Sequence, residues 1–117
     1  LTKNRLYSLS PASKAVVSTL SEPLTLKIFF SSNLLAPYNG VERYVHDLLQ
    51  EYALAGNHYF NYQFFDPSGD DAAAAKAQEL ASSYGIQPVQ IRAIEQDEVK
   101  FQKAYMGLVL IHGDLVE

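Results

Sequence analysis

The side chains best suited to chemistry are few and lie far apart in the sequence. The three histidines, His46, His58 and His112, have no metal-ligand spacing such as His-x-x-x-His. The absence of cysteine excludes thiol catalysis, thiolate metal sites and disulfide bonds. Neither a Gly-x-Ser-x-Gly motif nor a phosphate-binding glycine-rich loop is present. The sequence therefore predicts a protein that is not an enzyme and that holds no cofactor and no metal ion.

Acidic residues cluster in the segment DPSGDD, residues 66–71. A calcium-binding EF-hand loop that began at Asp66 would require glycine at its sixth position and glutamate at its twelfth. Those positions hold Asp71 and Ala77. We therefore interpret the segment as a turn that leads into a helix, whose dipole favours negative charge at the N-terminus.

The segment SSNLLAPYN, residues 31–39, carries the best candidates for a binding site. It follows a predicted strand, and open α/β sheets place their sites at the carboxyl ends of strands. Its leucines and tyrosine are unusually apolar for a loop, which indicates either a contact surface or a cover for the edge of the sheet. The candidate partner- or ligand-binding residues are Ser32, Asn33, Leu34, Leu35, Tyr38 and Asn39, together with Pro88 from a second turn.

The composition restricts the class of partner. Hydrophobic residues make up 48% of the chain and charged residues 19%, as in ordinary globular domains. The net charge is −4, so the basic footprint expected of a protein that binds nucleic acid is missing. The sequence therefore predicts one globular domain, residues 1–117, that binds no nucleic acid.

Periodicity and capping residues predict the elements that must position the candidate residues. The predicted helices cover residues 11–21, 40–55 and 72–84, with Ser10, Asn39 and Asp70-Asp71 at their N-termini. Gly56-Asn57 is predicted to end the second of these helices and Gly85 the third. The predicted strands cover residues 24–31, 59–66, 89–94 and 104–112, and a final strand starts at Leu115 after a tight turn at Gly113-Asp114. Residues 95–103 remain open between a loop, a short helix and the arm of a long hairpin.

This order of elements resembles the thioredoxin-like core, because two strand–helix–strand units are followed by a hairpin. We therefore expect an α/β fold with a thioredoxin-like sheet and flanking helices, and a small flavodoxin-like open sheet is the alternative. Pro88 lies where thioredoxin-like proteins keep a cis-proline, whereas the general preference of X–Pro bonds favours trans. Since the redox cysteines are missing, we interpret Pro88 as part of the scaffold.

Several stretches together resemble one family. They are LSPASKAVVSTLSEPLTLKIFFSSNL, YVHDLLQEYA, FFDPSGD, YGIQPVQ and AYMGLVLIHGD. They are similar to the extracytoplasmic domain of ABC-transporter auxiliary proteins, the group that contains the gliding-motility-associated ABC transporter component of Bacteroidetes. The family's Ser-Pro-x-Ser/Thr-Lys start, which follows soon after a membrane-spanning helix, is matched by Ser10, Pro11, Ser13 and Lys14.

The resemblance implies a domain on the periplasmic side of the bacterial inner membrane, tethered by a membrane-spanning segment of its parent protein. Its partners would be an ABC permease subunit and, through it, a cytoplasmic ATPase. The family implies no catalytic residues. Because the chain starts at Leu1 without a Met and a strand that begins at Leu115 is cut after three residues, we expect the chain to be excised from a longer protein, which the resemblance implies is membrane-tethered.

Two functions stay open at this stage. The domain acts through protein–protein contacts, or it binds a small ligand, a saccharide or a peptide, for the transporter. A cleft lined by Tyr38 and polar neighbours such as Asn33 and Asn39 would favour the small ligand. A flat or protruding apolar loop would favour the protein partner.

Overall fold

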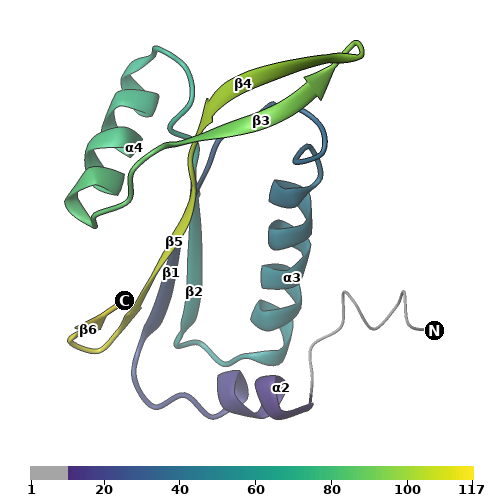
Figure 1. Cartoon of the computed structure of the whole chain (residues 1–117). Helices are drawn as coiled ribbons and strands as arrows, with labels where there is room; N and C mark the ends of the chain where they lie inside the picture. Colours follow the sequence, from purple (N-terminus) through teal and green to yellow (C-terminus); the bar gives the residue numbers. More distant parts are fainter. Residues whose placement is uncertain (1–10) are drawn as a thin grey trace. The chain divides into compact units, whose positions relative to one another are not determined.

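The computed structural model describes residues 11–117, and within them the chain is a mixed α/β protein with three helices and two sheets (Figure 1). The helices are α2 (Pro11–Ser18), α3 (Val41–Ala55) and α4 (Ala72–Ser83). The strands are β1 (Leu24–Phe30), β2 (Phe60–Phe65), β3 (Val89–Glu95), β4 (Glu98–Ala104), β5 (Met106–His112) and β6 (Leu115–Val116). Among these residues, no helix combines the length and the apolar character that crossing a lipid bilayer requires.

The predicted α/β class is confirmed, and the element boundaries differ from the expectation by a few residues. α2 ends at Ser18, before the predicted stop, and α3 starts at Val41, one residue later than an N-cap at Asn39 implies. The expected N-cap Ser10 lies outside the described residues.

The four-stranded sheet has the order β2-β1-β5-β6. β1 and β2 run parallel. At their starts the Leu24 N–H donates a hydrogen bond to the Tyr59 carbonyl at 2.8 Å, and just past their ends the Ser32 N–H donates to the Asp66 carboxylate at 3.2 Å. The loops that follow the carboxyl ends of these two strands are therefore neighbours.

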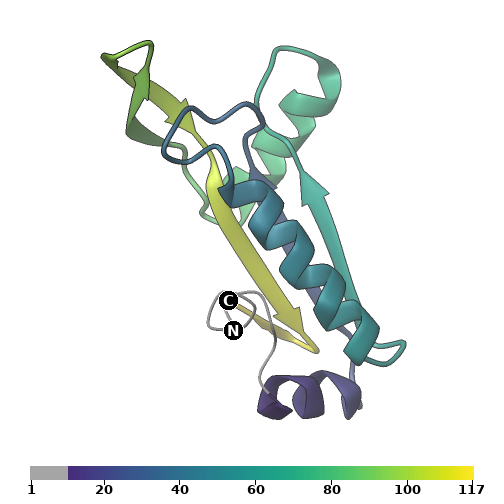
Figure 2. The same cartoon turned by 90° about the vertical axis from the view of Figure 1, so that its right-hand side faces the viewer.

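β5 runs antiparallel to β1. The Ser31 N–H, just past the end of β1, donates to the carbonyl of Tyr105 just before β5, and the Gly113 N–H after β5 donates to the carbonyl of Pro23 before β1. In Figure 2 the β2 and β5 arrows accordingly point in opposite directions. β6 returns beside β5 through the turn at Gly113-Asp114, as the sequence predicts.

The second sheet is the hairpin of β3 and β4. It settles residues 95–103 as a hairpin arm, the third of the three alternatives. The two connecting residues, Gln96 and Asp97, have φ angles of +53° and +64°. A two-residue turn with both central φ angles positive matches the right-handed twist of the flanking strands. Glu95 pairs with Glu98 directly beside it.

The described residues form two compact units. The first contains residues 11–26, 43–63 and 110–117, and the second contains residues 27–42 and 64–109. That the chain is a single domain stays a prediction.

In the first unit, the end of α3 is fitted against the end of α2. The Asn57 N–H donates to the Val17 carbonyl at 3.2 Å, and the Asn57 side-chain amide donates to the Leu20 carbonyl at 2.8 Å. A Cβ on Gly56 would lie 3.1 Å from both the Phe60 Cβ and the Tyr52 carbonyl oxygen. The predicted stop at Gly56-Asn57 is therefore confirmed, and close packing is the reason for the glycine.

In the second unit, the second half of β1 is fully buried. Ile28 and Phe29 have no exposed surface, and the Phe29 ring stacks on Phe65 of β2 with centroids 4.9 Å apart. Offset aromatic stacking at this separation adds to the stabilisation from burial.

α4 packs through an alanine stripe made of Ala74, Ala77 and Ala81, all buried. The Asp71 carboxylate caps the helix by accepting the Ala74 N–H at 2.8 Å, as the turn-and-cap interpretation predicts. Gly85 ends it with φ of +80°, a left-handed conformation that glycine adopts without a steric penalty. The small side chains of these alanines therefore form the buried face of α4.

Candidate functional site

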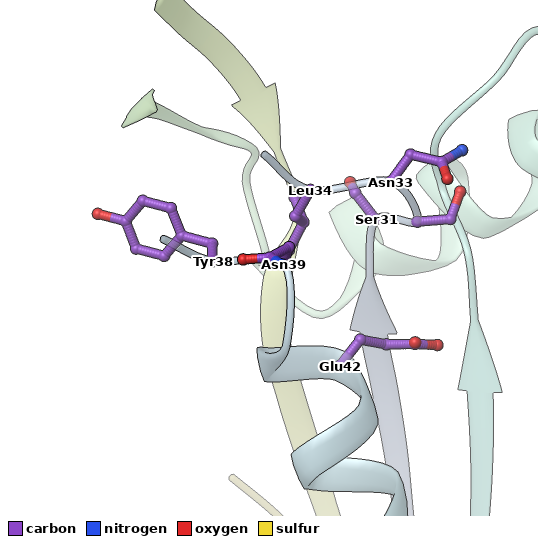
Figure 3. Close-up of a pocket in the computed structure, with 7 residues that line it drawn as sticks. Ser31, Asn33, Leu34, Tyr38, Asn39 and Glu42 are labelled. Carbon is purple, nitrogen blue, oxygen red and sulfur yellow. The ribbon is translucent and has the colours of Figure 1, made fainter. Parts of the chain in front are cut away.

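The predicted binding loop lines a cavity of about 390 Å³ within the second unit (Figure 3). Five of the seven candidate residues lie at this cavity, and Leu35 and Pro88 do not. The lining residues are Ser31, Ser32, Asn33, Leu34, Tyr38, Asn39 and Glu42.

The two candidates away from the cavity are both half-buried. Pro88 directly precedes β3, as a scaffold proline would. The Gln87–Pro88 bond is trans, which is the general preference of X–Pro bonds. Among residues 11–117 the cis peptide bond joins Ala36 and Pro37, inside the candidate loop itself.

The loop is fixed where it leaves β1. Ser31 is buried, with 3% of its surface exposed, and makes two hydrogen bonds with Tyr105. Its N–H donates to the Tyr105 carbonyl at 3.0 Å, and its Oγ accepts the Tyr105 N–H at 2.9 Å. The buried hydroxyl thus has a partner, which a buried polar group requires to avoid a desolvation penalty.

The next residue joins a cluster around the Asp66 carboxylate. Asp66 accepts hydrogen bonds from the Ser32 N–H at 3.2 Å, from the Ser68 N–H at 3.0 Å and from the Ser68 hydroxyl. The hydroxyls of Ser32 and Ser68 lie 3.1 Å apart. Burial favours the neutral carboxyl, but the hydrogen bonds from Ser68 and Ser32 outweigh it, so the pKa of Asp66 lies below its ordinary value of 3.8.

The middle of the loop is attached to the β3–β4 hairpin. Gln102 of β4 accepts the Leu35 N–H at 3.1 Å and donates to the Asn33 carbonyl at 3.2 Å. The Ile94 N–H of β3 donates to the Ala36 carbonyl at 2.8 Å, which forms an isolated antiparallel bridge. These contacts fix the loop backbone on the side that faces the hairpin.

Leu34 is part of the core and not of an exposed surface. It is 7% exposed and clusters with Ile91 of β3 and Ala104 of β4, with Tyr38 and Met106 packed against them. Of the two interpretations of the apolar loop residues, the cover for the sheet therefore describes Leu34.

The cavity presents hydrogen-bonding groups and one charge. Asn33 and Asn39 are exposed, and the Glu42 carboxylate is the single charged group in the lining. The Tyr38 ring extends away from Asn33 and Glu42 (Figure 3). Amides both donate and accept hydrogen bonds, whereas a carboxylate accepts them and repels anions. This lining suits neutral polar or cationic groups. Among the described residues, no group of three or more histidines and carboxylates could hold a metal ion.

Comparison with known protein families places the chain in one of them. Residues 3–111 match DUF7088, a domain of unknown function. The chain belongs to the DUF7088 family. No curated protein and no solved structure matches it. The DUF7088 match includes the whole candidate loop and both arms of the hairpin.

Sequence reasoning missed several residues that build the site of this DUF7088 domain. Ser31 and Glu42 line the cavity. Ser31 lies within the candidate segment 31–39 without being among the candidate residues, and Glu42 lies three positions beyond that segment, in the first turn of α3. Asp66, which the sequence places in a turn, and Gln102 fix the loop, and no local pattern indicates that either residue contacts it. Their contacts with the loop join residues 34 and 67 positions apart.

Proposed function

We propose that this DUF7088 domain is the extracytoplasmic domain of an auxiliary subunit of an ABC transport system. It acts by protein–protein contacts and not by catalysis, on the periplasmic side of the bacterial inner membrane. Its partners are the permease subunit and, through it, the cytoplasmic ATPase, and its parent protein is tethered by a membrane-spanning segment. The resemblance of its motifs to ABC-transporter auxiliary proteins supports this proposal.

The observation that carries a recognition role is the fixed backbone of the loop. Residues 31–36 are held by backbone and side-chain hydrogen bonds from Asp66, Ile94, Gln102 and Tyr105. The side chains of Asn33, Pro37 and Asn39 nevertheless remain exposed. A surface that is already ordered loses less conformational entropy on binding, so more of its contact energy appears as affinity.

We also propose that the four-stranded sheet is thioredoxin-like. Parallel β1 and β2 joined by a helix, followed by antiparallel β5 and β6 at the other edge, support this assignment. The β3–β4 hairpin is then an addition before β5. A flavodoxin-like sheet is built from parallel strands, and antiparallel β5 does not fit that arrangement.

The cavity favours a second candidate, the binding of a small saccharide or peptide. Its volume of about 390 Å³ falls in the range of small-molecule sites, and it is lined by Tyr38, Asn33 and Asn39. A cleft with this lining is the feature expected of a ligand-binding module, and it supports this second candidate.

Co-purification of the full-length protein from its native membranes after crosslinking tests the first proposal. Asn39→Arg places a bulky charge on the exposed loop and should remove the permease and ATPase subunits, identified by mass spectrometry, from the purified material. Asn61→Arg changes an exposed asparagine on β2 and should leave both subunits in place. Their absence from the wild-type sample, or their retention by Asn39→Arg, would contradict the proposal. Leu34 is unsuitable for this test because it is buried.

NMR titration with a neutral disaccharide and with trialanine tests the second candidate. Saturable shifts confined to the amides of residues 31–42, and removed by Asn33→Ala, would support the ligand-binding module. The absence of shifts at millimolar concentrations of both compounds would count against it.

A further inference from the structure

The β3–β4 hairpin has one partly buried face and one exposed face. Ile91, Ala93 and Ala104 on the first face are 6% exposed or less. The second face, here named the hairpin face, consists of Gln90, Arg92 and Ile94 of β3, paired with Lys103, Phe101 and Val99 of β4. All six residues are exposed.

The hairpin face is apolar in its half next to the tip. Ile94 is 57% exposed, Val99 51% and Phe101 66%, and Ile94 lies directly opposite Val99 in the register. An antiparallel hairpin that buries one face ordinarily presents polar side chains on the other. Neighbouring exposed apolar side chains of this size are typical of interaction surfaces.

The charge on the hairpin face has one sign. Arg92 lies opposite Phe101, Lys103 lies opposite Gln90, and the face includes no carboxylate. Neither cation forms a salt bridge within residues 11–117. The ion pair of this hairpin, Lys100 with Glu95 at 3.2 Å, belongs to residues of the opposite face. The surface therefore complements a partner that carries both apolar groups and carboxylates.

The negative charge of the hairpin tip makes an anionic lipid surface an unsuitable occupant of the hairpin face. Its four residues, Glu95, Gln96, Asp97 and Glu98, include three carboxylates, and the whole chain has a net charge of −4. Anionic leaflets attract clusters of basic residues at about 1 kcal/mol each and repel carboxylates. A bilayer would meet the acidic tip together with the two cations, whereas a short segment can pair with Arg92 and Lys103 alone, which the Ile94–Val99 pair separates from the tip.

We propose that the hairpin face is a docking surface for an acidic protein segment that also carries apolar side chains. The apolar groups of the segment cover Ile94, Val99 and Phe101, and its carboxylates pair with Arg92 and Lys103. This proposal does not rest on the transport function, because it involves none of the residues that line the cavity.

Binding of two synthetic peptides of about 12 residues to the whole chain tests the docking surface. One peptide alternates leucine with glutamate and the other alternates leucine with lysine. Fluorescence anisotropy should show saturable binding of the glutamate peptide, with a Kd at least about tenfold below that of the lysine peptide. Phe101→Ser should raise the Kd of the glutamate peptide by about tenfold or more, since the side chain is exposed and its loss leaves the core intact.

A matched pair of variants separates the hairpin face from general charge effects. Lys103→Gln and Lys100→Gln each remove one positive charge from β4, on opposite faces. Lys103→Gln should weaken binding of the glutamate peptide several-fold, and Lys100→Gln should leave the Kd unchanged. Equal effects of both variants, or equal affinity for both peptides, would overturn the proposal.

Two further outcomes would also overturn it in favour of other occupants. Binding to phosphatidylglycerol vesicles without binding of the glutamate peptide would assign the face to a membrane. Concentration-dependent dimerisation that Phe101→Ser abolishes, without peptide binding, would assign it to a second copy of this chain.

Discussion

The side chain of Gln102 reaches the backbone of Leu35 across 67 positions of sequence. Its carbonyl oxygen accepts the Leu35 N–H at 3.1 Å, and its amide group also donates to the carbonyl two residues earlier in the loop at 3.2 Å. One side chain therefore satisfies a donor and an acceptor of a segment that forms no regular secondary structure. The order of the candidate loop depends on the hairpin that carries this glutamine.

Gln102→Ala should loosen the loop without unfolding the domain. The loss of two neutral hydrogen bonds predicts a fall of about 1–2 kcal/mol in the free energy of unfolding. Hydrogen exchange should be faster at the Leu35 amide, whereas the Ala74 amide, bonded to Asp71, should keep its protection. Gln102→Glu retains the acceptor and should slow the Leu35 amide relative to Gln102→Ala. Unchanged exchange at Leu35 in both variants would show that the contact does not order the loop.

Leu34→Ala and Leu35→Ala should differ strongly in stability although the residues are adjacent. Leu34 is 7% exposed in a cluster with Ile91 and Ala104, so its truncation leaves a cavity and should cost about 2–5 kcal/mol. Leu35 is half-buried, and its truncation should cost about 1 kcal/mol or less. Urea denaturation measures both values. Equal losses would contradict the assignment of Leu34 to the core.

Gly56→Ala and Gly40→Ala provide a matched pair on the two ends of α3. A Cβ at position 56 meets the Phe60 side chain and the Tyr52 carbonyl at 3.1 Å, and this overpacking should cost about 1–3 kcal/mol. A Cβ at position 40 has no atom within 4 Å, so Gly40→Ala should change stability by less than about 1 kcal/mol. Thermal unfolding of the two variants measures the contrast, and a larger loss at position 40 would refute it.

Asp66 should make stability depend on pH in the acid range. Its pKa in the folded chain lies below the ordinary value of 3.8, so the ionised group contributes stability above that pH. This contribution is lost as the pH falls through the folded pKa. The difference in unfolding free energy between wild type and Asp66→Asn, measured in urea, should be constant from pH 7 to 5 and shrink below about pH 4. Ser68→Ala removes a hydroxyl donor and should reduce this pH dependence. A difference that grows on acidification would contradict the assignment.

The local features of the fold could be predicted from the sequence. The Asp71 cap, the Gly85 stop and the Gly56-Asn57 stop are each read from adjacent residues, and the structure places all three as expected. The structure of residues 95–103 could not be decided from the sequence. Gln96 and Asp97 adopt left-handed angles, but they lack the Asn-Gly or Asp-Gly signal of such turns.

The candidate site could be predicted only in part. Five of the candidate loop residues line the cavity. Their position after the carboxyl end of β1 could be predicted from the order of the elements. Leu34 is buried and Phe101 is exposed because only one face of the β3–β4 hairpin is covered by the loop. The alternation of apolar residues does not indicate which of the two faces is covered. The contacts of Gln102 and Asp66 with the loop are long-range, so no local pattern could reveal them.

The most direct test of the central claim is photo-crosslinking from the loop of the full-length protein in its native membranes. A crosslinking amino acid at position 39 is compared with one at position 79, an exposed residue on α4. The proposed transport role predicts crosslinks to the permease subunit from position 39 and none from position 79. No permease crosslink from position 39, or equal crosslinking from both positions, would contradict the claim that this loop is the contact surface.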